Sequence, residues 1–289
     1  MASTKYHVRS NSFPSQSHPN STRIEQELTR IKTWEASSTS TSDSITNGLY
    51  LLEDLYISLE DLLNMTSTKK LVSHHQGEKF VEELLDGSMK MLDICGITRD
   101  TMLQIKENVQ SLHSSLRRRK GYSSIETSVA EYKFFTKNMK KNVTKLTTSL
   151  KHMEAKFGAT SLLNQDQEFA AVITVIREVI AMNLSIFQSV LSFLAGSSSK
   201  SKATKWLKVA KLMHKRVSCE ENMENLNELL CVEASLRTLL REGSNVSKDA
   251  HGKFEALENA IEMIENGLES LFRRLVKTRV HLLNIITLQ

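Results

Sequence analysis

The residue types that most often carry catalysis or hold a metal ion are sparse in this chain and form no known pattern. Cys219 and Cys231 have no pair of histidines at zinc-ligand spacing beside them. His74 and His75 are adjacent, so on a helix their rings would diverge by about 100°, and the nearby Gly77 predicts a loop. No phosphate-binding glycine loop, His-Glu-x-x-His, Cys-x-x-Cys or Gly-x-Ser-x-Gly motif occurs. We therefore expect no enzyme activity, no metal and no cofactor.

The N-terminal tail has the one motif that suggests a modification site. Arg9, Ser12 and Pro14 fit the Arg-Ser-x-Ser-x-Pro pattern that 14-3-3 proteins bind once the second serine is phosphorylated. A phosphate adds about −1.5 to −2 charge, which an arginine cluster in a partner can pair. Residues 1–20 are rich in Ser, Asn and Pro and predict a disordered tail that a kinase could reach.

A second candidate contact is a lysine-rich segment over residues 202–217. On a helical wheel, Trp206 shares one side with apolar residues, whereas the lysines lie on the other side. Those lysines are Lys205, Lys208, Lys211 and Lys215. The pattern is typical of an interfacial anchor on an anionic membrane. It is equally typical of an ordinary amphipathic helix in a bundle, and the sequence leaves both readings open.

The segment before it, Phe169 to Ala195, is apolar nearly all round. Val179 to Ala195 has no charge, which reaches only the lower end of the roughly 17–25 residues that span a bilayer. Asn183 and several serines dilute it further. The sequence therefore favours a buried central helix over a membrane span, with anchoring through residues 169–217 as the alternative.

The rest of the chain predicts long helices. Only Pro14 and Pro19 could break a helix, so long uninterrupted helices are allowed. Residues 125–157 and 254–285 repeat apolar positions at spacings of four and three, with only Thr136 and Thr278 as polar interruptions. Such a repeat is typical of coiled coils and of bundles packed at shallow angles. We predict an all-α, elongated bundle of long antiparallel helices with coiled-coil-like heptad packing, and an intermolecular coiled coil is the alternative.

Three local features complete the fold prediction. Asp43 or Ser44 is expected to cap a helix whose leucines, from Leu49 to Leu62, form one stripe. Residues 81–116 predict one kinked helix or two. Gly196 lies where the apolar period breaks, as expected of a residue that ends a helix.

Composition supports one intracellular domain over residues 21–289. The 289 residues include 40% hydrophobic and 25% charged residues, which is ordinary for a globular protein. Three cysteines and an N-terminus without an apolar stretch predict a reducing, cytoplasmic setting, with a peripheral membrane location as the alternative. The net charge of +5 is mild, and the basic clusters lack interleaved stacking aromatics, so nucleic-acid binding is not expected.

Several stretches resemble a known group of proteins. They are Tyr6–Pro14, Val81–Ser88, Leu92–Gly96, Leu116–Arg119 and Leu271–Ile285. Together they resemble a plant-specific family of helical proteins grouped with the BYPASS-type developmental proteins, and the similarity spans essentially the whole chain. The resemblance implies a role in root and shoot development, and it supplies no reaction, cofactor or catalytic residue.

Three functions remain open from the sequence. The favoured one is a non-enzymatic helical interaction protein with protein partners, including a 14-3-3 protein at the tail. The others are a membrane-associated protein and an all-α enzyme with a site assembled from scattered residues. A pocket lined by converging polar groups would favour the enzyme, whereas a filled core would favour the interaction protein.

Overall fold

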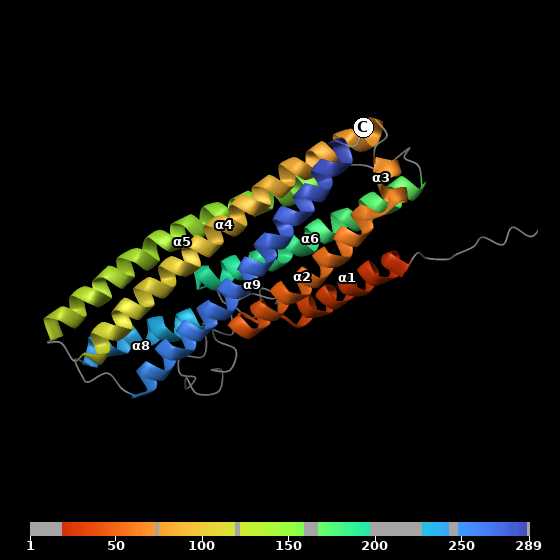
Figure 1. The fold of residues 1–289 in the computed structure, drawn as a ribbon. Helices are drawn as coiled ribbons and strands as arrows, with labels where there is room; N and C mark the ends of the chain where they lie inside the picture. The colour runs from red at the N-terminus through yellow and green to blue at the C-terminus, as the bar shows by residue number, and fades with distance from the viewer. Residues whose placement is uncertain are drawn as a thin grey trace, which may run out of the picture.

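The computed structural model describes residues 19–72, 75–118, 122–158, 167–196, 227–242 and 248–287. Every regular element in these ranges is an α-helix, which confirms the predicted all-α class. The helices are α1 (Pro19–Ser37), α2 (Ser42–Asn64), α3 (Thr66–Val72), α4 (His75–Arg117), α5 (Tyr122–Gly158), α6 (Gln167–Ala195), α8 (Glu228–Glu242) and α9 (Lys248–Thr287). Figure 1 shows them lying along an elongated bundle, with α9, in blue, between α4 and α2.

The two long apolar repeats form the inner faces of α5 and α9. Every member of the α9 repeat is buried, and the α5 repeat is buried except at its two half-buried ends. Thr136 satisfies its hydroxyl by donating to the Tyr132 carbonyl at 2.8 Å. Thr278 is also buried, but its hydroxyl has no hydrogen-bond partner among the described residues.

Residues 81–116, for which the sequence predicted one kinked helix or two, lie within the single helix α4 of 43 residues. The predicted loop at His75 and Gly77 is wrong, since α4 already begins at His75. Glycine inside a helix costs about 1 kcal/mol relative to alanine. At Gly87, however, a larger residue would clash with α5, because a Cβ there would lie 2.4 Å from Cζ of Phe157.

The start of α2 differs from the prediction. Thr41, not Asp43 or Ser44, is the N-cap, and its side chain accepts from the Ser44 backbone N–H. Thr, Asp and Ser can all cap, so composition alone cannot place the boundary. The next residue, Ser42, donates to the Glu228 carboxylate of α8 at 2.5 Å, so this helix end is also tied to another element. The predicted leucine stripe of α2 is buried. Helix α1 begins at Pro19, just inside the predicted tail.

Helix α6 is a core helix along its second half. From Met182 to Leu194 no residue is exposed, whereas Ala171, Thr174 and Ala181 in the first half face solvent. The prediction of burial on most faces therefore holds for the second half, where α6 packs between neighbouring helices. Gly196 ends the helix as expected, with φ +62° and its N–H donating to the Phe193 carbonyl at 3.0 Å.

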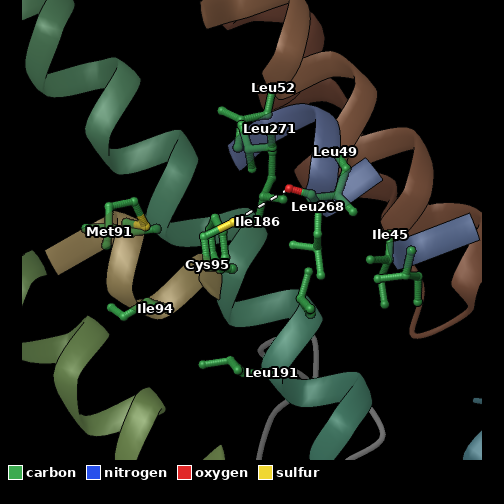
Figure 2. Close-up of a cluster of buried hydrophobic side chains, with 14 of the residues drawn as sticks. Ile45, Leu49, Leu52, Met91, Ile94, Cys95, Ile186, Leu191, Leu268 and Leu271 are labelled. Carbon is green, nitrogen blue, oxygen red and sulfur yellow. Dashed lines mark hydrogen bonds between the residues drawn. The ribbon is translucent and has the colours of Figure 1, made fainter. Parts of the chain in front are cut away.

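The centre of the core is a layer of side chains from α2, α4, α6 and α9. Figure 2 shows members of this layer, and the labelled ones are Ile45, Leu49, Leu52, Met91, Ile94, Cys95, Ile186, Leu191, Leu268 and Leu271. Cys95 donates from Sγ to the Leu268 carbonyl at 3.7 Å. Burial raises the pKa of the Cys95 thiol to about 12, so it stays protonated and behaves as a small core residue.

Candidate functional site on helix α9

Both contact sites predicted from the sequence lie outside the described residues. They are Arg9, Ser12 and Pro14 in the tail, and Lys205, Trp206, Lys208, Lys211 and Lys215 in the lysine-rich segment. Cys219 lies outside as well, and Cys231 on α8 is half-buried. Among the described residues, no group of three or more His, Cys, Asp or Glu side chains could hold a metal ion. Several of the polar clusters that the structure places together involve α9.

The side of α9 that faces α4 carries an antiparallel series of ion pairs. Glu265 pairs with Lys106 at 3.4 Å, and Glu269 pairs with Arg99. Further along, Arg279 donates from Nη1 to the Leu85 carbonyl at 2.5 Å and to the Ser88 hydroxyl at 2.8 Å. This arginine belongs to one of the stretches that carry the family resemblance, and Ser88 to another.

The side of α9 that faces α2 carries a partly buried cluster. Glu60 on α2 is 4% exposed, and its Oε2 accepts Lys277 at 2.7 Å and lies 3.6 Å from Arg274. Arg274 also lies 3.5 Å from Glu53. A buried carboxylate needs such cations, since an unpaired charge there would be costly. The polar contacts of α9 with α4 form one seam and those with α2 form a second seam. The two seams hold α9 in position and in rotation.

Near the N-terminal end of α9, two histidines and a glutamate form a chain. His113 Nδ1 lies 2.8 Å from Glu258 Oε1, and His113 Nε2 lies 3.2 Å from His251 Nδ1. A carboxylate can only accept a hydrogen bond, so the contact with Glu258 is donated by Nδ1 of His113. The His113 ring stacks on Phe254, with centroids 5.2 Å apart. Burial, His113 and Arg117 lower the pKa of His251.

A cavity of about 60 Å³ lies inside the bundle between α2, α4, α5, α6 and α9. Its walls are mainly aliphatic and aromatic, and four side chains, Tyr56, Ser88, Asn183 and Thr278, bring polar atoms to them. The Asn183 amide donates to the Tyr56 hydroxyl, which leaves Asn183 Oδ1 buried without a partner. The Thr278 hydroxyl is buried and unpartnered in the same wall.

Among the described residues, none that lines the cavity is charged at neutral pH. Tyr56 is the one titratable side chain in that described lining, and burial raises the pKa of its phenol well above the ordinary value. Ser88 donates to the Leu85 carbonyl at 2.8 Å and has no imidazole or carboxylate in the same wall. The cavity can therefore form hydrogen bonds at neutral pH, but its lining offers no general base.

The outward face of α9 carries a stripe of exposed apolar residues. Val276, Val280 and Leu283 are 41%, 48% and 41% exposed and recur at spacings of four and three, which places them on one face. The other large apolar side chains exposed in the described ranges do not form such a series. Arg273 and Lys277, both highly exposed, border the stripe.

Most of this site was not predicted from the sequence. Residues 254–285 show a core repeat, and the outward stripe lies in the same stretch at the same spacing, so a signal for the stripe is present there. The cavity had no such signal, because Tyr56 and Asn183 are 127 residues apart and each stands alone in an apolar segment.

Comparison with known proteins gives one match. No curated protein and no solved structure matches this chain. The model of the family described as Protein BPS1 matches residues 48–285, from the second turn of α2 to the last turn of α9. That range contains the α9 stripe, both seams and every residue that lines the cavity. By this match over most of its length, the chain belongs to the BPS1 family.

Proposed function

We propose that this protein is a non-enzymatic interaction protein that acts in root and shoot development by binding a protein partner on the outward face of α9. Membership of the BPS1 family supports a role in plant development. The finer statement, binding through α9, rests on the chemistry of that helix.

The observation that carries the proposal is the stripe of Val276, Val280 and Leu283. Isolated exposed apolar residues are normal on a protein surface, but a contiguous row on one helix face is a typical binding surface. Its spacing matches the anchor positions through which two helices pack. Arg273 and Lys277 beside it are exposed and pair with Glu269 and Glu60, so carboxylates of a partner would share these two cations. We therefore assign the partner's contact element as an amphipathic helix with an acidic edge.

The polar chemistry of the interior supports binding over catalysis. The cavity does bring polar groups together, which is the feature that would favour an enzyme. The lining residues that the structure describes, however, include no carboxylate, imidazole, amine or thiol, and the phenol of Tyr56 stays protonated. General acid–base catalysis needs a group whose pKa lies near the working pH.

The test uses the full-length chain expressed in plant roots and chemically cross-linked at lysine. The double variant Val280→Glu, Leu283→Glu removes the stripe, and the control Phe134→Glu changes an even more exposed apolar residue on α5. In the wild type and in Phe134→Glu, we expect Lys277 to be cross-linked to a partner protein, and the cross-linked residue of that partner to lie in an acidic helix. In the double variant this cross-link should be lost. Recovery of the same cross-links from all three proteins would refute the proposal.

A second proposal is membrane contact through the lysine-rich segment 202–217. One helix of the described part of the chain, over Glu168–Ala195, is long and apolar enough to cross a bilayer, and 44% of that window is buried in the bundle. The packing of this helix in the bundle favours a role in the core. We therefore place the membrane contact at the lysines of segment 202–217. Charge reversal at Lys205, Lys208, Lys211 and Lys215 should weaken binding to anionic vesicles at low salt. Equal binding by both proteins would exclude this contact.

A further inference from the structure

The cavity between α2, α4, α5, α6 and α9 contains two buried hydrogen-bonding atoms with no partner. Asn183 is 2% exposed and Thr278 is 6% exposed, and both line the cavity. The Asn183 amide nitrogen is used by Tyr56, so its carbonyl oxygen remains as an acceptor. An unpartnered polar group in an apolar interior is costly. Two in one small cavity indicate that something else supplies their hydrogen bonds.

The surroundings define what that molecule can be. Most of the wall is aliphatic or aromatic, for example Leu63, Met91 and Ile176, so the bulk of the molecule must be apolar. Within the described part of the chain no charged side chain lines the cavity, and a buried ion without a counter-charge is strongly disfavoured. The molecule is therefore uncharged. To satisfy Asn183 Oδ1 it must donate a hydrogen bond, as a hydroxyl does.

A route to the cavity exists on the side where α5 ends. An open groove of about 580 Å³ runs there between α1, α5 and α6, and Phe157 and Ile180 line both the groove and the cavity. These two half-buried side chains thus separate the cavity from the groove. Phe157 is in the last turn of α5, and its ring tip fits against α4 only because residue 87 is glycine.

The charges of the groove agree with an uncharged ligand. Glu35, Glu154 and Glu178 line the groove, and Arg177 is the only cation among its lining residues. Lys32 pairs with Glu178 at 2.8 Å, and Ser185 donates to Glu35 at 2.6 Å. The described groove lining thus has three carboxylates and one guanidinium, and this excess of negative charge disfavours an anionic ligand at the entrance.

We propose that this cavity binds a small, uncharged, apolar molecule that carries a hydroxyl group, held by Asn183 and Thr278 and admitted from the groove past Phe157. The volume of about 60 Å³ exceeds the roughly 10–15 Å³ that one water needs. It is smaller than the roughly 150 Å³ of an engineered cavity that binds benzene. A ring-sized ligand therefore requires the Phe157 ring to move outward. The proposal does not depend on the interaction surface of α9.

The test follows methyl resonances of the full-length protein labelled with ¹³C at methionine. Met91 and Met153 line the cavity, whereas Met263 is exposed elsewhere on α9 and serves as the internal control. The probes are cyclopentanol, methylcyclopentane of the same shape without a hydroxyl, and the anion cyclopentanecarboxylate. Each is titrated into the wild type and into Phe157→Ala, which opens the route.

Cyclopentanol should shift the Met91 and Met153 resonances saturably, with tighter binding to Phe157→Ala than to the wild type. It should bind about five-fold more tightly than methylcyclopentane, the effect of one net hydrogen bond. The carboxylate should cause no shift, and Asn183→Leu, or Thr278→Val if the first variant does not fold, should remove the preference for the alcohol. Equal affinity for the alcohol and the hydrocarbon, or no shift in either protein, would overturn the proposal.

Discussion

Arg279 on α9 donates a hydrogen bond to the hydroxyl of Ser88 on α4 at 2.8 Å, and the same nitrogen reaches the Leu85 carbonyl. The residue before it, Thr278, faces the cavity, and the residue after it, Val280, belongs to the outward stripe. This contact therefore joins the ion pairs with α4 and α2 in holding the rotation of α9 that turns one face inward and the other outward.

Replacing this arginine should destabilise the bundle. Arg279→Met removes two hydrogen bonds from a charged donor, each worth about 1.5–3 kcal/mol before relaxation, so we expect the free energy of unfolding to fall by about 2 kcal/mol. Arg273→Met is the matched control on the same helix, because Arg273 is exposed and, among the described residues, pairs with Glu269 one turn away on α9. Urea denaturation measures both. A loss for Arg279→Met no larger than for the control would show that the contact does not fix α9.

Placing a charge in the second half of α6 should prevent folding. Leu184 is 3% exposed, and Leu184→Asp places a carboxylate at a buried position of the core, at a cost of several kcal/mol. Ala181→Asp, on the exposed side of the same helix, should leave the melting temperature nearly unchanged. Thermal unfolding followed by circular dichroism compares the two. A Leu184→Asp protein that melts like the wild type would mean that α6 is not core.

Stability should fall as the pH drops through the ordinary range of histidine. Burial and the neighbouring His113 lower the pKa of His251 in the folded protein. The unfolded chain therefore binds this proton first, at a pH near 6.5, and gains stability relative to the folded state below that pH. The midpoint of urea denaturation should be lower at pH 5.5 than at pH 7.5. His251→Asn should reduce this difference, whereas His152→Asn, on the exposed side of α5, should not. An unchanged slope in His251→Asn would contradict the assignment.

The N-terminal tail should bind a 14-3-3 protein when it is phosphorylated. A peptide covering Tyr6 to His18 with phosphate on Ser12 is expected to bind, because Arg9 and Pro14 stand at the positions of the recognised pattern. The unmodified peptide should not bind, and Ser12→Ala should abolish binding in the full-length protein. Fluorescence anisotropy measures the peptides. Indistinguishable affinities would remove the tail from the list of partner sites.

The helices could be predicted because their signal is local. A spacing of four and three marks the buried face of α5 and α9 without reference to any other part of the chain. Thr278 shows where that reasoning stops, because its position on the stripe predicts burial but does not predict that its hydroxyl lacks a partner. The cap of α2 was misplaced for a similar reason: Thr41 and Asp43 are chemically equivalent candidates, and only the backbone conformation decides between them.

The cavity could not be predicted because it is made by five helices at once. Gly87 and Phe157 belong to different helices, and nothing in either segment indicates that one ring fills the space left by the other residue's missing side chain. The outward stripe was different, since Val276, Val280 and Leu283 were visible as a second apolar series beside the core repeat of the last helix. A search for two apolar faces on one helix would have found it.

The most direct test of the central claim, that the protein acts through the outward face of α9, is complementation of plants that lack it. The double variant Val280→Glu, Leu283→Glu alters only exposed positions, so its thermal unfolding should match that of the wild type. We predict that plants expressing it retain the root and shoot defects, whereas plants expressing Phe134→Glu at the same level develop normally. Normal development in plants that carry the folded double variant would contradict the account.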